Sequence, residues 1–146
     1  MTEILIKKLS KEVPLPKYET DGSSGLDLAA CLDKNIEIKP GKSEIIPTGL
    51  AVAIPKNFEI QIRPRSGLAS KNQISVLNTP GTIDADYRGE LKVILINLSD
   101  KSFIVEKGLR IAQIVLCPVV KAQLKEVETL QDTKRGSGGF GSTGVK

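Results

Sequence analysis

The sequence predicts an all-β domain, and three observations support this prediction. Short apolar runs follow one another from Asn35 to Arg63, and proline and glycine separate them at the roughly 8–12 residue spacing typical of antiparallel sandwiches and barrels. Phe58, Ile60 and Ile62 alternate with polar residues, as in a half-buried strand. No segment sustains the period of about 3.6 residues that marks an amphipathic helix.

The expected elements cover most of the chain up to Val120. The expected strands are Thr2–Leu9, Leu26–Ala30, the runs NIEIK, SEIIPT, LAVAIP and FEIQIR, and then Ile74–Leu77, Leu91–Asn97, Ser102–Val105 and Leu109–Val120. Val13 to Pro16 cannot be helical, because it contains two prolines, and is expected to be an extended linker. The only helix candidates are a turn or two at Ser66–Lys71 and a short segment at Ala122–Leu130.

One domain and one tail account for the length of the chain. With 146 residues, of which 40% are hydrophobic and 26% charged, the composition is that of a single globular domain. The last sixteen residues differ, because they contain five glycines and a single aromatic residue, Phe140. Such a segment cannot bury enough surface to order itself. We therefore expect a domain over residues 1–130 and a flexible arm over residues 131–146.

Composition also excludes several classes of function. The chain has no histidine, which rules out Ser-His-Asp and Cys-His catalysis and His-ligated zinc. Acid–base chemistry would then fall to carboxylates, lysine or tyrosine. The net charge of +4 is too small, and its charges too scattered, to predict a nucleic-acid surface. No apolar run approaches the roughly 20 residues that a membrane helix needs.

The cysteines and the N-terminal sequence bear on the compartment. Cys31 and Cys117 do not have the spacing of metal ligands, and the sequence from Met1 has no apolar or Arg/Ser-rich leader. We expect both thiols to be reduced, small and semi-buried. The expected location is therefore the cytoplasm.

The stretch Asn78–Asn97 is the clearest candidate for a functional site. It ends in a predicted strand, and a Pro-Gly turn and an Arg-Gly turn bend the loop before that strand. Asp84, Asp86 and Tyr87 lie between the two turns, and loops on a rigid β scaffold often carry chemistry. The alternative is a solvated turn whose aspartates have no further role. The stretch alone leaves the two interpretations equally open.

Three other residue groups could bind an anion or a metal ion. The sequence Arg63-Pro64-Arg65-Ser66-Gly67 directly follows a strand, and its two guanidinium groups, its hydroxyl and its glycine could grip a phosphate. An arginine at a strand end is, however, often only solvated. Asp27 follows a Gly-rich loop and is either a solvated strand residue or one that helps hold a metal through water. Alternation places Gln113 on the face of Ile111, and a glutamine that points into a core needs partners, which is consistent with a site.

The arm contains RGSGGFGSTG, which matches G-x-G-x-x-G only in its letters. No strand is expected before it and no helix after it, and a GK[ST] sequence is absent, so neither a dinucleotide fold nor a Walker A loop is predicted. As a flexible cap, its glycine amides could surround phosphates while Arg135 supplies charge and Phe140 stacks on a base. A disordered solubilising tail is the alternative, and it leaves Phe140 unexplained.

Five stretches of the chain, taken in order, resemble the motifs of the trimeric dUTP pyrophosphatases (dUTPases). They are SSGLDLAA, PRSGLA, NTPGTIDADYRGE, GLRIAQIVL and RGSGGFGSTG. The resemblance covers essentially the whole chain, and it departs from the family pattern at Ser24, where alanine is usual. It implies a jelly-roll-like β-barrel in a homotrimer with a flexible Gly-rich C-terminal arm, in which each active site combines motifs from several subunits.

The resemblance also implies the reaction and its cofactor. Such an enzyme hydrolyses dUTP to dUMP and pyrophosphate by attack of water on the α-phosphorus, which keeps uracil out of DNA and supplies dUMP for thymidylate synthesis. Asp84 would orient and deprotonate the attacking water. Mg²⁺ would bridge the triphosphate oxygens, and Asp27 would hold it through water.

The other residues that the resemblance implies would bind the substrate. The uracil would sit in a hairpin from Asn78 to Tyr87, and Tyr87 would lie under the deoxyribose, where a 2′-hydroxyl would clash. The full implied set is Arg65, Ser66, Gly67, Asn78, Thr82, Ile83, Tyr87, Gln113, Arg135, Phe140, Gly141 and Ser142.

Two other functions remain open at this point. The dCTP deaminases resemble the same scaffold, but their activating carboxylate is a glutamate in the hairpin, where this sequence has Asp84. A catalytically silent trimer that binds nucleotide for regulation is the second alternative. The presence of Asp27, Asp84 and the arm argues against it.

Overall fold

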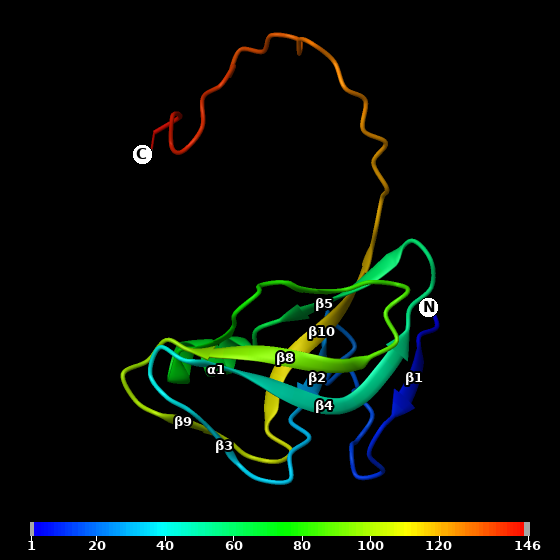
Figure 1. Ribbon diagram of the computed structural model, residues 1–146, viewed down its shortest axis with the longest axis vertical. Coiled ribbons are helices and arrows are strands. Elements are labelled where there is room, and N and C mark those ends of the chain that lie inside the picture. The colour runs from blue at the N-terminus through cyan, green and yellow to red at the C-terminus, as the bar shows by residue number, and fades with distance from the viewer. Residues whose placement is uncertain (1, 145–146) are drawn as a thin grey trace.

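The computed structural model describes residues 2–144, whose strands form two four-stranded sheets and one two-stranded sheet (Figure 1). The strand orders are β1-β4-β8-β6, β2-β10-β5-β7 and β3-β9, and the paired strands are antiparallel. The elements are β1 Leu5–Lys8, β2 Leu26–Ala29, β3 Ile36–Ile38, β4 Ser43–Ala53, β5 Phe58–Arg63, α1 Ser66–Asn72, β6 Ile74–Val76, β7 Gly81–Ile83, β8 Glu90–Asn97, β9 Phe103–Val105 and β10 Arg110–Pro118. The prediction of a mostly β fold is confirmed. Within residues 2–144, these strand pairings do not join the sheets into a closed barrel.

The two helix candidates have different outcomes. Ser66–Lys71 lies in α1, which is the only helix among residues 2–144. The candidate at Ala122–Leu130 is wrong, because β10 ends at Pro118 and residues 119–144 contain neither helix nor strand. Every residue from 121 to 130 is exposed, so no packing partner stabilises a helix there. An isolated helix of this length is marginal in water.

The core lies between the two four-stranded sheets. In β8, Leu91, Val93 and Leu95 are buried while Lys92 is exposed, which confirms the predicted alternation. Buried residues of the second sheet, such as Leu28, belong to the same hydrophobic cluster. The core is aliphatic throughout, and burial of each large side chain contributes about 1.5–3 kcal/mol.

Strand β4 corrects the expectation that SEIIPT and LAVAIP are separate strands. Pro47 lies inside β4, where the register against β8 shifts between Pro47 and Ala51, and Gly49 has a φ of 68° in the left-handed region. Side chains supply hydrogen bonds at this irregularity. Thr48 Oγ1 donates to the Leu91 carbonyl at 2.6 Å, and the Gly49 amide donates to Glu90 Oε1 at 2.9 Å. A proline is tolerated inside a strand at such an irregularity.

The expected hairpin of Asn78–Tyr87 contains a single described strand, β7, and the two strands of the longer segment Asn78–Asn97 belong to different sheets. Gly81 and Ile83 of β7 pair with Ile62 and Ile60 of β5, whereas β8 pairs with β4 and β6. The loop of residues 84–89 therefore carries the chain from one sheet to the other. Gly81 fits closely here, because a Cβ at this position would lie 3.3 Å from the Cβ of Ile62.

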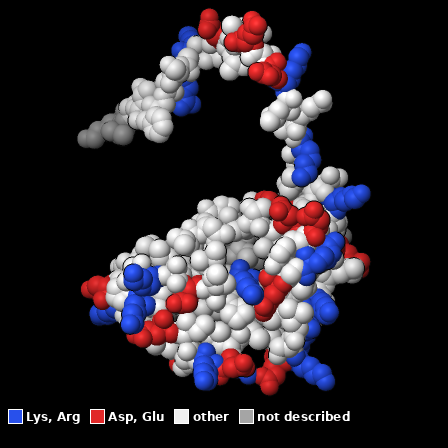
Figure 2. Space-filling view, in the orientation of Figure 1, with Lys and Arg blue, Asp and Glu red and all other residues white. Residues whose placement is uncertain are grey.

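The surface carries charges of both signs. Figure 2 shows Lys and Arg interspersed with Asp and Glu on the visible face of the body and along the arm. Cys31 and Cys117 are free and half-buried. Within residues 2–144, no helix combines the length and the apolar character needed to cross a membrane.

The buried side chain of Asn97 ties the end of β8 to two neighbouring segments. Its Nδ2 donates to the carbonyls of Ile38 and Lys101, at 2.8 and 2.7 Å. Its Oδ1 accepts from the Ser99 amide at 2.9 Å and from the Ser99 hydroxyl at 2.7 Å. Asn97 is fully buried, and both ends of its amide are satisfied.

We predict that Asn97→Ala lowers the free energy of unfolding by about 2–3 kcal/mol, because it leaves buried backbone groups without partners. Urea denaturation at a fixed protein concentration measures the change. Asn72→Ala is the matched control, because Asn72 is an exposed asparagine at the end of α1, and its free energy of unfolding should change by less than about 0.5 kcal/mol. Equal losses in the two variants would contradict a structural role for the Asn97 network.

Candidate active site

Asp27, on β2, is the centre of an ion-pair cluster. Arg65 Nε donates to Asp27 Oδ1 at 3.0 Å, and Arg110 Nη1 donates to Asp27 Oδ2 at 3.0 Å. Arg65 Nη1 also donates to the main-chain carbonyl of Arg110 at 3.2 Å. The Asp27 side chain is only 18% exposed, so the two guanidinium groups balance a carboxylate that is largely withdrawn from water.

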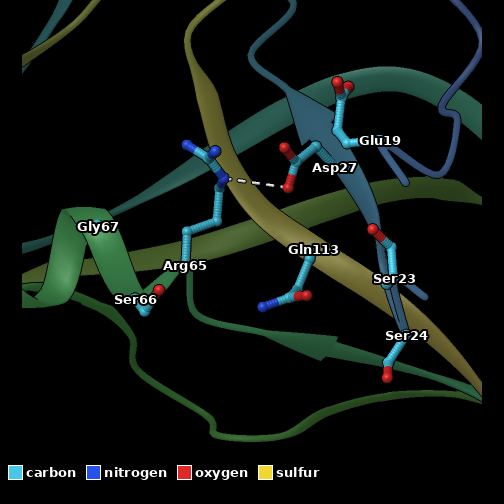
Figure 3. A pocket seen from close by; sticks show the side chains of 9 residues that line it. Glu19, Ser23, Ser24, Asp27, Arg65, Ser66, Gly67 and Gln113 are labelled. Carbon is cyan, nitrogen blue, oxygen red and sulfur yellow. Dashed lines mark hydrogen bonds and ion pairs between the residues drawn. The ribbon is translucent and has the colours of Figure 1, made fainter. Parts of the chain in front are cut away.

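The pairing of three strands brings the cluster together. β10 lies between β2 and β5, with Gln113 opposite both Asp27 and Arg63. Two residues after Arg63, Arg65 caps α1 in an extended conformation. In Figure 3, Asp27 and Arg65 face each other, and Gln113 of β10 lies beside them.

The orientation of Gln113 corrects the sequence-based expectation. The register of β10 against β2 shifts between Arg110 and Ala112, so Ile111 and Ala112 are both buried. Gln113 then faces the pocket instead of sharing the core face with Ile111. Its Nε2 donates to the Pro64 carbonyl at 2.9 Å, which holds the side chain beside the start of α1. The simple alternation fails because a β-bulge inserts one residue.

These residues line one open cavity of about 290 Å³. Its lining residues are Glu19, Ser23, Ser24, Gly25, Asp27, Arg65, Ser66, Gly67 and Gln113. The structure thus brings together the five residues predicted from the first, second and fourth motifs. Guanidinium and hydroxyl groups around an open space are suited to binding a polyanion.

The sequence analysis missed Arg110 and Glu19 as members of this site. Arg110 Nη1 lies 3.6 Å from Glu19 Oε1, in addition to its bond to Asp27. Arg110 stands in the fourth motif, but alternation gave no reason to pair it with Asp27. No sequence signal singles out Glu19, which lies in a loop eight residues before Asp27.

The candidate residues on the Asn78–Asn97 segment lie in a different place. Asn78, Thr82 and Ile83 line a small cavity of about 60 Å³, together with Ile62 and Val93 of the core and other neighbours. This cavity shares no lining residue with the Asp27 cavity.

Asp84 and Tyr87 follow β7 on the same segment. Asp84 is exposed, and its carbonyl accepts a hydrogen bond from the Tyr87 amide at 3.1 Å. Tyr87 is 43% exposed, and its hydroxyl donates to the Glu90 carbonyl at 3.0 Å. Neither residue lines the Asp27 cavity.

The arm holds the third group of candidates, which is Arg135, Phe140, Gly141 and Ser142. The chain leaves the body after β10, and the segment that follows, which ends in the arm, extends away from the body (Figure 1). Phe140 is fully exposed, and Arg135 Nε donates to the nearby Gly138 carbonyl at 2.8 Å. One chain therefore presents the predicted site in three separate parts.

The side chains of the Asp27 cavity can hold a metal ion only if a bound ligand supplies further coordinating groups. Within residues 2–144, no group of three or more Asp, Glu, Cys or His side chains converges on one point. Asp27 offers a single carboxylate beside an open cavity. This fits Mg²⁺, which commonly keeps several waters and is held by one or two carboxylates together with substrate phosphates.

The fold and these parts define a class of protein, namely a mostly β protein with a polar cavity around an aspartate–arginine ion pair and an exposed carboxylate on a separate loop. Comparisons with known proteins identify the family. The dUTPase family model matches residues 11–144. The chain belongs to the dUTPase family.

Curated relatives match over almost the full length of the chain. The deoxyuridine 5′-triphosphate nucleotidohydrolase of Rickettsia bellii (strain OSU 85-389) is 58% identical over 146 residues, covering 99% of this chain and 97% of the relative. The enzyme of the same name from Hydrogenobaculum sp. (strain Y04AAS1) is 56% identical over 144 residues, covering 99% of each chain.

A solved structure shares the fold. The dUTPase of Staphylococcus bacteriophage 80alpha, determined with dUpNHpp, superposes with a TM-score of 0.88 at 29% sequence identity. The likeness covers 99% of this chain and 100% of that chain.

Proposed function

We propose that this chain hydrolyses dUTP to dUMP and pyrophosphate, by attack of water on the α-phosphorus. The observation that carries the proposal is its full-length likeness to relatives named deoxyuridine 5′-triphosphate nucleotidohydrolase. The geometry is consistent with this activity, since the chain offers a polyanion cavity around Asp27 and Arg65 and a separate small cavity beside Asn78. The reaction keeps uracil out of DNA and supplies dUMP.

The Asp27 cavity is the proposed site of the triphosphate. Arg65, Ser66, Gly67 and Gln113 bind its oxygens, and Arg65 exchanges part of its bond to Asp27 for the phosphates. In phosphoryl transfer most of the rate comes from positioning and neutralisation of charge, so a cavity lined by guanidinium and hydroxyl groups is suited to this role.

Asp27 is the proposed residue for Mg²⁺, which it would hold through water. Bound Mg²⁺ supplies positive charge that neutralises the triphosphate. Arg110 keeps its own hydrogen bond to Asp27 Oδ2, so the carboxylate stays oriented when Arg65 turns toward the substrate.

The Asn78–Asn97 segment is the proposed site of the base, the sugar and the attacking water. Asn78, Thr82 and Ile83 bind the uracil. The cavity that these residues line is small, so it excludes a larger base. Tyr87 packs against the deoxyribose. Asp84 is the general base, and its exposed position at the end of β7 leaves its carboxylate open to a water molecule.

The separation of these parts supports a homotrimer of jelly-roll-like subunits with shared active sites. In a single chain neither cavity contains an arm residue. The segment before the arm also carries exposed apolar side chains that are suited to contact with a neighbouring subunit, among them Val120, Leu124 and Leu130. We assign residues 131–144 to a flexible arm that closes over a neighbouring subunit's site, so that Arg135, Phe140, Gly141 and Ser142 contact the nucleotide. Residues 145 and 146 of the predicted arm lie outside the described residues.

We predict that the protein incubated with dUTP and Mg²⁺ releases dUMP and pyrophosphate, and that Asp84→Asn lowers turnover by roughly 10²–10⁴-fold, the usual size of a general-base contribution. Asp84→Asn should still bind dUpNHpp, because the substitution is nearly isosteric. Asp86→Asn, two residues away and also exposed, is the matched control and should keep normal turnover.

A parallel incubation with dCTP separates the alternatives. Release of ammonia from dCTP would indicate a deaminase, and binding of nucleotide without any product would indicate a silent regulatory trimer. Normal turnover in Asp84→Asn would remove Asp84 from the role of general base.

We predict that truncation before Arg135 leaves the assembly and the thermal stability nearly unchanged while turnover collapses. None of residues 135–144 belongs to the hydrophobic core or packs against it, so their loss removes no core packing. Light scattering, thermal unfolding and pyrophosphate release measure the three quantities. Phe140→Ala should cause part of the same loss of turnover. Equal rates for the truncated and full-length proteins would show that the arm has no part in catalysis.

We also predict that two inactive chains complement each other. Full-length protein should scatter light as a trimer, near three times 15.7 kDa. When Asp84→Asn chains are refolded together with truncated chains, some sites combine an intact Asp84 from one subunit with an arm from another, and turnover returns. If the mixture stays as inactive as its parts, each active site lies within one chain.

A further inference from the structure

We propose that Gly89 is a positioning residue that determines sugar specificity, because its missing side chain provides the space in which the Tyr87 ring lies. The inference rests on the proposed function, in which Tyr87 packs against the deoxyribose. It adds Gly89, which contacts no part of the substrate in that proposal, to the residues that discriminate dUTP from UTP.

The Tyr87 ring folds back over its own chain. Its hydroxyl donates to the Glu90 carbonyl at 3.0 Å, three residues further on, so the ring spans Arg88 and Gly89. The side chain is 43% exposed despite this contact. One side of the ring therefore rests on the backbone while the rest stays available to a ligand.

Gly89 is required here for space and not for backbone conformation. A Cβ at Gly89 would lie 2.6 Å from Tyr87 Cζ and 3.0 Å from Cε2, and closer still to the hydroxyl oxygen. Gly89 does not have the left-handed φ that Gly41, Gly49 and Gly108 have. An alanine could therefore adopt the φ of Gly89, and the three atoms nearest to its Cβ, outside the adjacent residues, all belong to the Tyr87 side chain.

The surroundings ensure that the ring moves rather than the loop. The Glu90 carboxylate accepts a hydrogen bond from the Gly49 amide of β4 at 2.9 Å, which fixes the residue that holds the Tyr87 hydroxyl. Arg88 Nη1 donates to the Ala85 carbonyl at 2.7 Å and to the Tyr87 carbonyl at 2.9 Å, which fixes the loop. A methyl group at Gly89 thus breaks the Tyr87–Glu90 bond and displaces the ring.

The expected result of Gly89→Ala is a loss of sugar discrimination. The ratio of kcat/KM for dUTP to kcat/KM for UTP should fall by roughly tenfold, the scale at which a packed surface discriminates one small group. Pyrophosphate release from each nucleotide measures the ratio. Gly22→Ala is the matched control, because Gly22 is an exposed loop glycine without a left-handed φ. A Cβ added at Gly22 would have no neighbouring atom within 4 Å outside the adjacent residues, so the ratio should stay unchanged.

A double-mutant cycle separates the clash with Tyr87 from a general disturbance of the loop. In a Tyr87→Ala background there is no ring to displace, so adding Gly89→Ala should change the ratio by less than about twofold. An equal effect of Gly89→Ala in both backgrounds would overturn the proposal, as would an unchanged ratio in the single variant. If Gly89→Ala alone does not fold but the double variant with Tyr87→Ala folds, the result supports a clash with the Tyr87 ring. If neither variant folds, the proposal is overturned.

Tyrosine fluorescence tests the same contact without any enzymatic assay. The chain has no tryptophan and only two tyrosines, so Tyr18→Phe leaves Tyr87 as its single tyrosine fluorophore. Adding Gly89→Ala to Tyr18→Phe should increase quenching of that fluorescence by acrylamide, whereas adding Gly22→Ala should not. Unchanged quenching would overturn the Gly89 proposal. Absence of dUTP hydrolysis by the unmodified protein would instead refute the proposed function, so the two failures are distinguishable.

Discussion

The position of β10 between β2 and β5 is the constraint on which the Asp27 cavity depends. Its two ladders place Gln113 level with Asp27 on one side and with Arg63 on the other. The bulge between Arg110 and Ala112 turns Gln113 outward while Ile111 and Ala112 both stay in the core. Gly25 completes the arrangement, because a Cβ there would lie 3.2 Å from Gln113 Cδ and closer still to its amide oxygen. The cavity is therefore a consequence of strand register, and a shift of β10 by one residue would remove it.

The charges within the cavity are balanced before any ligand binds. Asp27 accepts from Arg65 and Arg110 on different oxygens, so neither guanidinium is an unpaired charge in a partly desolvated place. A polyanion that enters must compete with Asp27 for Arg65. In the proposed reaction the cost of that exchange is offset because Arg110 remains with Asp27 and Mg²⁺ brings further positive charge. In that proposal the cluster neutralises Asp27 before the substrate binds and then releases Arg65 to the substrate.

The sequence predicted the parts of this protein better than their arrangement. The alternation of β8 and the short helix after Arg65 follow from local pattern and are confirmed. Pro47 predicted a break between two strands, but β4 continues through it. The side chains of Thr48 and Glu90 form hydrogen bonds to the backbone at this irregularity. Hydrogen bonds between residues that are distant in sequence leave no local signal. The bulge in β10 was hidden because Ala112 is small enough for either face. The Arg110–Asp27 pair spans 83 residues and was missed for the same reason of distance in sequence. The roles of the individual site residues came from motif resemblance and remain proposals.

The composition of the glycine-rich arm explains why, under the proposed function, the arm would close over the site only when the substrate is bound. Ordering each residue of such a segment costs on the order of 1–2 kcal/mol, and the arm between Arg135 and Ser142 has one large apolar side chain, Phe140, to offset that cost. Phe140 is fully exposed in the single chain, so its own subunit offers it no stabilising surface. A ligand with both a base to stack on and a triphosphate for Arg135 and the glycine amides can supply the missing free energy. Under the proposed function, a fragment that carries only one of these groups would leave the arm open, and closure would then contribute to specificity in addition to excluding water.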